Sequence, residues 1–391
     1  MLTFTLTVTS PATYTVSYNA NGGAGAPASQ TKTYGVTLTL SKTAPTRTGY
    51  TFLGWATSST ATTAAYKAGG SYTANASATL YAVWKISYAA PTVVRMGGAD
   101  RYETAVLIAK QGWKTSDTVL LAYSMNYPDA LAGVTLASAL NAPILLTDAA
   151  STPGATMTEV RSLKAKNIIL LGGVGVISAA QETALKNAGY KVTRYGGTNR
   201  YGTAQLIGNA VENLGGSKTA VLATGMDFPD ALVMSSYAGM QKMPMIFADK
   251  NSLPTETQSF IKNNKITKVV VVNDAGSIGA AVITQVKNLV GAANVTVITA
   301  SDRYDLSAKV ANQYKSSFAN GVAVATGANF PDALTGGVLA AKMEFPVMLL
   351  NPATGATAAE KAYVKSLSGP QIYVFGGTGV VSDSAVLGLY K

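Results

Sequence analysis

The sequence predicts a multidomain fold in which a small β-rich module precedes three copies of one α/β unit with mostly parallel sheets. From about residue 92 to the end, Arg-Tyr and then an aromatic residue followed by Pro-Asp-Ala-Leu recur three times in the same order. Before residue 92 the chain is rich in Thr, Ala, Gly and Tyr, with short β-type runs. Repeats this far apart indicate repeated domains and not the turns of a solenoid.

The composition narrows the chemistry that the chain can carry. Its 391 residues are 48% hydrophobic and 13% charged, which predicts several domains with apolar cores. The sequence has no cysteine and no histidine, so it lacks thiolate nucleophiles, the commonest metal ligands and the usual general base. We therefore expect no catalytic residues, no metal site and no cofactor, although Asp/Glu or Ser–Lys pairs remain as alternatives. No apolar run reaches the ~18 residues of a membrane span.

The net charge of +11 is unevenly distributed, because residues 1–90 contain five basic residues and no acidic ones. Basic proteins bind polyanions such as nucleic acid, acidic membranes or anionic polysaccharide. The basic residues here are mostly single Lys without an Arg-rich run, which argues against nucleic acid. An anionic carbohydrate is therefore a candidate partner, and a surface that only keeps the protein soluble is the alternative.

The N-terminal region predicts a lead-in at residues 1–13 and a small β module at residues 14–85. Met1–Ser10 alternates apolar residues with Thr and has no signal-peptide pattern, so we expect the chain to begin inside a longer exported protein. Glycine-rich turn signals separate the β-type runs. These runs are Tyr14–Tyr18, Val36–Leu40, Tyr50–Trp55 and Thr79–Trp84.

Several motifs of this region occur in a characteristic order. They are Tyr18-Asn19-x-Asn21-Gly22-Gly23, Pro45-x-Arg47-x-Gly49-Tyr50-x-Phe52-x-Gly54-Trp55 and Leu80-Tyr81-Ala82-x-Trp84. The order resembles the internalin B-type repeat, which implies a β-grasp-like module used in extended surface proteins. We expect Trp55 and Trp84 to anchor its small core, with carbohydrate stacking as the alternative.

After a linker at residues 86–92, the copies are expected at residues 93–192, 193–295 and 296–391. In the first copy, strands are expected at Val93–Met96, Thr118–Ala122, Ile144–Thr147 and Ile168–Leu171. Each strand leads to a helix, starting at Arg101, about Tyr127, about Met157 and Ser178. The strands are continuous apolar runs, as expected for a parallel sheet covered by helices on both faces.

The motifs of the first copy are Gly97-Gly98-x-Asp100-Arg101-Tyr102, Asn126-Tyr127-Pro128-Asp129-Ala130-Leu131, Pro143-Ile144-Leu145-Leu146 and Gly172-Gly173-x-Gly175. Recurring in order in each copy, they resemble the type 2 cell-wall-binding repeat of Gram-positive surface proteins. The resemblance implies a pseudo-threefold trio at the cell surface that holds an anionic wall polysaccharide non-covalently. Two departures are visible. The second copy has Asn273-Asp274 in place of the last Gly-Gly, and the third has Thr299-Ala300 in place of the first.

The candidate ligand-binding residues are those of the recurring motifs. They are Arg101, Tyr102, Asp129, Arg200, Tyr201, Asp230, Arg303, Tyr304, Asp332, Gly172, Gly173, Gly376 and Gly377. An Arg at the first position of a helix faces the positive end of the helix dipole, so an anion is expected beside it. That anion is either the Asp of a Pro-Asp-Ala-Leu run, as a structural ion pair, or a group of the ligand.

Other residues of the same motifs have a structural interpretation. Asp100, Asn199 and Asp302 are expected to cap the helices that follow them. Asn126, Asp227 and Asn329 are expected to do the same for the Pro-Asp-Ala-Leu helices. The Gly-Gly-x-Gly runs form tight turns or, as the alternative, expose backbone N–H groups to an anion.

Two other functions remain open at this stage. One is an adhesin that binds a host or neighbouring surface through the N-terminal module. The other is the anchor fragment of an amidase-type wall hydrolase whose catalytic domain lies outside this chain.

Overall fold

The computed structural model describes residues 10–86 and 90–390, which fall into two compact units divided between Ala90 and Pro91. Most of the predicted lead-in and part of the predicted linker lie outside the described residues. We refer to residues 10–86 as the small module and to residues 91–390 as the block.

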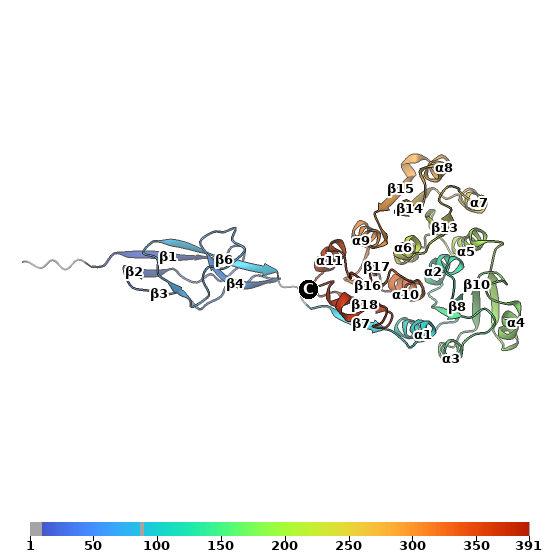
Figure 1. Ribbon diagram of the computed structural model, residues 1–391, viewed down its shortest axis with the longest axis horizontal. Coiled ribbons are helices and arrows are strands. Elements are labelled where there is room, and N and C mark those ends of the chain that lie inside the picture. The colour runs from blue at the N-terminus through green and yellow to red at the C-terminus, as the bar shows by residue number, and fades with distance from the viewer. Residues whose placement is uncertain (1–9, 87–89, 391) are drawn as a thin grey trace, which may run out of the picture. The chain divides into compact units, whose positions relative to one another are not determined.

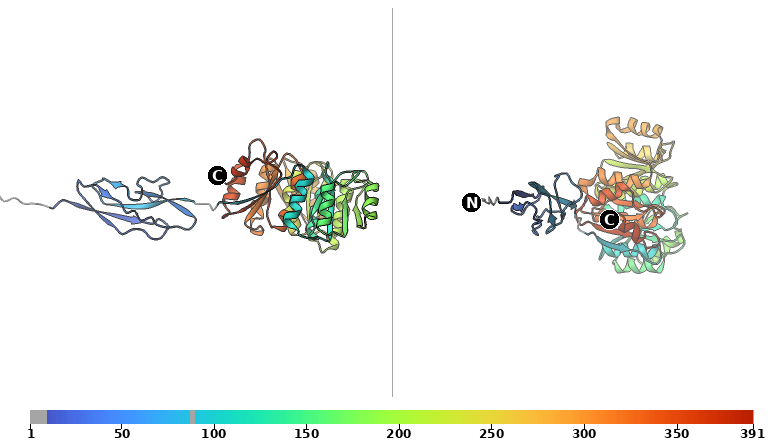
Figure 2. Two further views of the ribbon diagram at one scale, coloured as in Figure 1. Left: turned by 90° about the horizontal axis from the view of Figure 1, so that it is seen from below. Right: turned by 60° about the vertical axis from the view of Figure 1, so that its left-hand side comes forward.

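The small module is built from strands, and no helix is present in residues 10–86 (Figure 2). Its main sheet has the order β2-β1-β6-β4, in which β1 and β6 are parallel and the other pairs antiparallel. A second, two-stranded sheet pairs β3 with β5. The strands are β1 (Thr13–Asn19), β2 (Gln30–Thr33), β3 (Leu38–Thr39), β4 (Tyr50–Ala56), β5 (Ser71–Tyr72) and β6 (Ala78–Ile86). The predicted β module is confirmed, although β2 and β5 were not expected.

Aromatic side chains fill the core of the small module. Trp55 is fully buried, with the rings of Tyr18 and Phe52 edge-on to it at 4.8 and 5.0 Å. The indole N–H of Trp84 donates to the carbonyl of Ala20 at 2.9 Å. A domain this small buries little surface, so a few large rings supply much of its stability. Both tryptophans therefore have the structural role that the sequence predicts.

The block contains three parallel four-stranded sheets with the orders β9-β8-β10-β11, β13-β12-β14-β15 and β17-β16-β18-β7 (Figure 1). The first is formed by β8 (Thr118–Tyr123), β9 (Ile144–Thr147), β10 (Asn167–Leu171) and β11 (Lys191–Tyr195). The second contains β12 (Thr219–Thr224), β13 (Met245–Ala248), β14 (Lys268–Asp274) and β15 (Val295–Ala300). The third contains β7 (Thr92–Met96), β16 (Gly321–Thr326), β17 (Val347–Leu350) and β18 (Gln371–Phe375).

Each sheet takes its fourth strand from another copy. The strand that opens the second or third copy pairs with the last strand of the copy before it, and β7, which opens the first copy, pairs with β18 of the third. The Arg95 guanidinium fastens this closing strand, since it donates to the Gly376 carbonyl at 2.9 Å and pairs with Asp383 at 2.8 Å. The ring of copies is closed by the first residues of the block.

Helices lie between and around these sheets. Their bounds are α1 (Arg101–Gly112), α2 (Pro128–Ala139), α3 (Gly154–Ser162), α4 (Ala179–Asn187), α5 (Arg200–Asn213), α6 (Pro229–Met240), α7 (Thr255–Asn263), α8 (Ala280–Val290), α9 (Arg303–Gln313), α10 (Pro331–Lys342), α11 (Ala358–Lys365) and α12 (Asp383–Leu387). The helices expected in the first copy are present, with ends that shift by a few residues.

The three helices that begin with Pro-Asp-Ala-Leu, namely α2, α6 and α10, pack against one another in the middle of the block (Figure 1). Their small residues permit a close approach: a Cβ on Gly337 would lie 2.6 Å from the Ser235 hydroxyl of the neighbouring helix. One continuous apolar core joins residues of all three copies around these helices. The three repeated α/β modules are confirmed, and they share a common centre.

Candidate functional site

The strand order of each sheet creates a crevice at a defined place. In each sheet the chain passes from an inner strand (β8, β12 or β16) to the edge strand on one side of it (β9, β13 or β17). It then crosses to the strand on the other side (β10, β14 or β18). The direction in which strands are added therefore reverses between β8 and β10, between β12 and β14, and between β16 and β18. In open parallel sheets, ligands bind beyond the carboxyl ends of the strands at this reversal. The helix of the next copy (α5, α9 or α1) begins there as well. We call these places the first, second and third junction.

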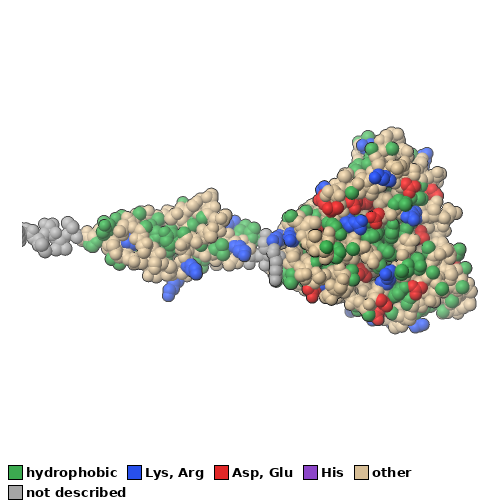
Figure 3. All heavy atoms as spheres, in the orientation of Figure 1, with side chains coloured by type: hydrophobic (Ala, Val, Ile, Leu, Met, Phe, Trp, Pro, Cys, Tyr) green, Lys and Arg blue, Asp and Glu red, His purple; other side chains and the backbone are tan. Residues whose placement is uncertain are grey.

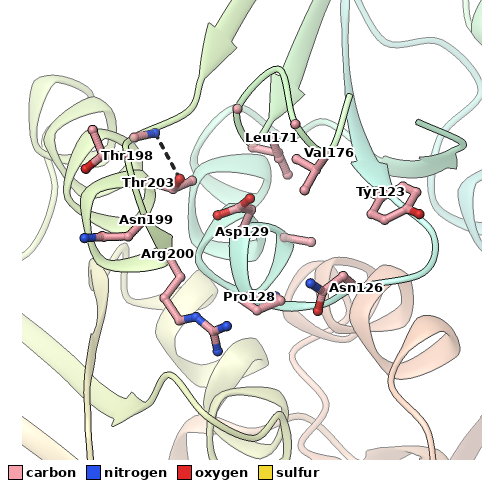
Figure 4. A pocket seen from close by; sticks show the side chains of 14 residues that line it. Tyr123, Asn126, Pro128, Asp129, Leu171, Val176, Thr198, Asn199, Arg200 and Thr203 are labelled. Carbon is pink, nitrogen blue, oxygen red and sulfur yellow. Dashed lines mark hydrogen bonds between the residues drawn. The ribbon is translucent and has the colours of Figure 1, made fainter. Parts of the chain in front are cut away.

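The first junction contains a groove of about 240 Å³ (Figure 4). The ends of β8 and β10 form one wall, with Tyr123, Leu171 and Gly173, while Asn199 and Arg200 of the second copy form the other. The lining residues also include Asn126, Pro128, Asp129, Ala130, Gly175, Val176, Gly197, Thr198 and Thr203. The groove is therefore made by two copies together.

Asp129 lies in the first turn of α2 and belongs to the groove lining. Burial raises the pKa of this carboxyl, while the hydroxyl of Thr203 and the charge of Arg200 lower it in part. Burial likewise raises the pKa of Asp332 at the third junction to about 6, against the lowering effect of Arg101. Each of these carboxyls is influenced by the Arg of the next copy around the ring.

The three arginines do not form the ion pairs with the Pro-Asp-Ala-Leu aspartates that the sequence suggested. Each Nη1 instead donates to a carbonyl just beyond a strand of its own copy: Arg101 to Ser124 at 2.6 Å, Arg303 to Gly327 at 2.7 Å, and Arg200 to Gly225. Among the described residues, one of these three arginines forms an ion pair: Arg303 pairs with Asp227 at 3.0 Å. The structural-pair hypothesis is wrong in its partner, because the strand-end carbonyls accept the guanidinium protons.

The tyrosines of the Arg-Tyr motif hold loops in place. The Tyr102 hydroxyl donates to Asp148 and the Tyr201 hydroxyl to Asp249, each just after the second strand of its sheet. Burial, followed by the Asp148 contact, raises the pKa of Tyr102. In the third copy Asn351 follows β17 at the corresponding place, and a Cβ on Gly327 would touch the Tyr304 ring. These contacts give the tyrosines a structural role.

The first glycine of each Gly-Gly-x-Gly run is required by packing against a carboxyl group. A Cβ on Gly172 would lie 2.7 Å from Oδ2 of Asp129, and one on Gly376 would lie 2.8 Å from Oδ2 of Asp332. The φ angles of these glycines, 116° and 112°, also favour glycine. The second glycine of each run has more room, since a Cβ on Gly173 would lie 3.6 Å from the Gly197 carbonyl oxygen and one on Gly377 would lie 4.0 Å from that of Gly98. These runs are tight turns that leave room for the carboxylate.

The two sets of predicted helix caps have different outcomes. Asp100, Asn199 and Asp302 cap α1, α5 and α9 through their side chains, as predicted. The expected caps at Asn126, Asp227 and Asn329 are wrong, because α2, α6 and α10 start one residue later and the side chain reaches only the next backbone N–H. Proline at the first position of these helices removes one N–H that would otherwise need a partner.

The aromatic residue before each Pro-Asp-Ala-Leu run marks the repeats in the sequence, but its role is apparent only in the structure. Tyr127, Phe228 and Phe330 meet pairwise, with ring centroids 5.5 to 6.1 Å apart. The Arg303 guanidinium lies 5.2 Å from the centre of the Phe228 ring. The threefold recurrence of an aromatic at this position was the available signal. The rings fix the starts of the three central helices relative to one another.

The two departures noted in separate copies lie side by side. Because β15 of the third copy pairs with β14 of the second, Asn273 is opposite Thr299 and Asp274 is opposite Ala300. The second junction thus differs from the other two, where Gly196 meets Gly173 and Gly97 meets Gly377.

The described residues show neither a helix long and apolar enough to cross a membrane nor a group of three Asp or Glu placed to hold a metal ion.

Comparison with known proteins assigns the repeats. Residues 95–182, 194–283 and 298–386 match the family described as cell wall binding domain 2 (CWB2), and residues 14–83 match the Listeria-Bacteroides repeat domain. The chain is 32% identical over 291 residues to the N-acetylmuramoyl-L-alanine amidase LytC of Bacillus subtilis, covering 74% of this chain and 56% of the amidase. It is 31% identical over 288 residues to the amidase enhancer of the same organism, covering 74% of this chain and 39% of the enhancer.

Solved structures agree with this assignment. Cwp6 from Clostridium difficile has a TM-score of 0.71 at 28% identity, over 77% of this chain and 48% of that protein. Cwp8 from the same organism has a TM-score of 0.68 at 23% identity, over 82% and 57% of the two chains, and supports the fold. The matched repeats cover most of the block in all three copies. The chain belongs to the cell wall binding domain 2 family.

Proposed function

We propose that the block anchors a surface protein non-covalently to an anionic polysaccharide of a Gram-positive cell wall, outside the cell and without catalysis. The observation that carries this proposal is the groove at the first junction, where Asp129 of one copy and Arg200 of the next line one cavity. The match of three copies to a family of cell wall binding domains supports the same function.

The groove suits an anionic polysaccharide. A carboxylate accepts hydrogen bonds from sugar hydroxyls, and a guanidinium presents several N–H groups to a phosphate or carboxylate. Arg200 uses Nη1 for the Gly225 carbonyl and also contacts the Tyr127 hydroxyl, and the rest of the fork is left for a ligand. At the third junction, Asp332 and Arg101 provide the same two groups. Two weak sites on one rigid block bind a repeating polymer more tightly than either site alone.

The small module is proposed to be displayed for interaction with a further partner. Its groove of about 890 Å³ is lined by Arg47, Tyr50, Phe52 and Trp84, among others. The Arg47 guanidinium lies 3.8 Å from the centre of the Tyr50 ring. The face of the module in Figure 3 carries basic but no acidic side chains, whereas that of the block carries both. An adhesin that binds a host or neighbouring surface through this groove is the second candidate function.

A third candidate is the anchor part of a wall hydrolase. The relatives include an amidase and an amidase enhancer, and the chain covers about half or less of each. On this hypothesis the matched region would anchor a catalytic domain that lies outside the sequence.

The test of anchoring is co-sedimentation with purified cell walls before and after their anionic polymers are stripped. The protein should sediment with intact walls and stay in solution with stripped walls. Equal binding to both preparations would contradict an anionic ligand.

A salt titration on intact walls sharpens this test. Binding should weaken steeply as the salt concentration rises to about 0.5 M, because exposed charge contacts are screened. Binding that does not change over this range would indicate a neutral glycan. Divalent metal ions should not be needed for binding.

A further inference from the structure

We infer that the three junctions of the block are not equivalent binding sites: the first and third junctions take the anionic polymer, and the second is closed to it by its own side chains. This inference rests on the proposed function and adds to it the number of sites and the residues that set that number. Pseudo-threefold symmetry alone would lead one to expect three equal sites.

At the first junction the ligand-facing groups are available. Asp129 lines an open groove, and its neighbours Asn126, Gly173 and Asn199 carry no charge. Arg200 is the cation of this groove, and it forms no salt bridge with a carboxylate of the described residues. The site thus offers one acceptor for hydroxyl groups and one cation for an anionic group, with no further carboxylate in the groove lining.

At the second junction the equivalent carboxylate is already satisfied. Asp230 is fully buried, its Oδ1 accepts the Asp274 backbone N–H at 2.9 Å, and its Oδ2 accepts the Ser277 hydroxyl at 2.5 Å. The residues that correspond to Ser277 in the first and third copies are Val176 and Val380, which have no hydroxyl to donate. A carboxylate enclosed in this way cannot accept a bond from a sugar.

The cation of the second junction is also engaged. Arg303 pairs with Asp227 at 3.0 Å through Nη2 and donates Nη1 to the Gly327 carbonyl. The position of Asp227 is held by a neutral residue in the other two copies, namely Asn126 and Asn329. The protein itself therefore supplies the anion that a ligand would have to replace.

Added negative charge makes the second junction unfavourable for an anion. Asp274 stands where the other copies have Gly173 and Gly377, and Asp227 stands where they have Asn126 and Asn329, so at these two positions this junction has two carboxylates that the other two junctions lack. Asp227 and Asp302 are close enough to Asp274 to raise its pKa, although burial is the largest cause. Like charges repel an approaching phosphate or carboxylate.

The third junction shares most features with the first, although Asp100 stands there in place of Asn199. Asp332 has a glycine against its carboxylate, Asn329 precedes α10, and Arg101 has no carboxylate partner in the described salt bridges. Thr104 accepts the Gly98 N–H at 3.0 Å, as Thr203 accepts that of Gly197 at 3.0 Å. In the third copy the corresponding residue is the buried Leu306. Two junctions thus share one construction.

The experiment compares three matched variants, Arg101→Gln, Arg200→Gln and Arg303→Gln, in titrations of purified walls. Arg101→Gln and Arg200→Gln should each weaken binding about tenfold, the loss expected for one charge-assisted contact. Arg303→Gln should change it less than about twofold, because Arg303 contacts only its own protein. Thermal unfolding of each variant establishes that a loss of binding is not a loss of folding.

A second arm frees Arg303 instead of removing it. In the double variant D227N/D274N, Arg303 loses its partner and the junction loses two negative charges, so wall binding should become stronger. Adding Arg303→Gln to this background should then cost binding, although the same change is silent in the wild type. Non-additivity of this kind identifies a contact that exists only in the opened junction.

If the wild-type protein binds walls and all three single variants fold normally but lose binding equally, the inference is overturned and anchoring stays in place. An Arg303→Gln change that remains silent in the D227N/D274N background would overturn the role given to the two aspartates. Wild-type protein that does not bind walls at all would overturn the proposed function itself.

Discussion

The small module and the block differ in where the strands of their sheets come from and in how their cores are packed. In the small module, every strand of the main sheet comes from one local stretch of chain, and fully buried Trp55 fills the core. In the block, every sheet needs a strand from another copy, and the central helices meet through Gly, Ala and Ser. A sheet whose strands all come from one stretch of chain can fold alone. Sheets that include a strand from another copy make the stability of the three copies interdependent. We therefore expect the small module to fold independently and the block to unfold as one unit.

The largest effect is expected when the closing strand β7 is removed. A chain that starts at residue 97 should lose several kcal/mol of unfolding free energy, because Met96 leaves the core and β18 becomes an exposed edge. The control starts at residue 91 and keeps β7. Denaturant unfolding measures both chains. Equal stability of the two would mean that ring closure contributes nothing.

Limited proteolysis tests the same interdependence without mutation. Cleavage near residues 86–92 should release a stable fragment that contains all three copies, because no copy completes its sheet alone. Mass spectrometry of the fragments identifies them. Recovery of single stable copies would contradict one cooperative block.

The next effect concerns the core of the small module. Trp55→Ala should destabilise the small module by about 4 kcal/mol, enough to unfold so small a domain. The unfolding transition of the block should stay unchanged, which calorimetry on the full chain can resolve. Tyr34→Ala is the matched control, since that ring is 59% exposed. A shift of both transitions by Trp55→Ala would show that the two parts are coupled.

The smallest effect is a pH dependence confined to the block. Burial raises the pKa of Glu360 to about 7, against hydrogen bonds from Thr357 and Ser307 that lower it. The folded state therefore binds a proton that the unfolded state, with an ordinary pKa of 4.5, has lost at pH 6. The unfolding free energy of the block should fall as the pH rises from 5 to 8, by on the order of 2 kcal/mol for this group.

Glu360→Gln should reduce this slope and stabilise the block at pH 8. Asp230 and Asp332, whose pKa values are both raised to about 6 by burial, should leave a smaller slope of the same sign. Glu344→Gln, at an exposed position, is the control and should leave the profile unchanged. A block whose stability rises between pH 5 and pH 8 would contradict the burial of these carboxyls.

Much of the fold could be predicted, because local sequence patterns that recur three times specify its strands and helices. The apolar runs, the prolines before β9, β13 and β17, and the Pro-Asp-Ala-Leu helices all appear where the periodicity places them. The exchange of strands could not be predicted. A repeat boundary in a sequence does not say whether β11 pairs within its own copy or with the one before.

The sequence predicted which residues line the candidate site better than it predicted their hydrogen-bond partners. Asp129 and Arg200 meet in one groove, but the arginines bind strand-end carbonyls, which are backbone groups without a sequence signal. The inequivalence of the copies was visible as two separate departures. Only the pairing of β14 with β15 brings Asp274 and Ala300 to a single junction.

The central claim is that the block alone holds the wall polymer. Its most direct test is co-sedimentation of two fragments, residues 10–86 and residues 91–391, with purified walls, alongside the full chain. The account predicts that residues 91–391 bind with the affinity of the full chain and that residues 10–86 stay in solution. Binding by residues 10–86 that equals that of the full chain, or failure of residues 91–391 to bind, would contradict it.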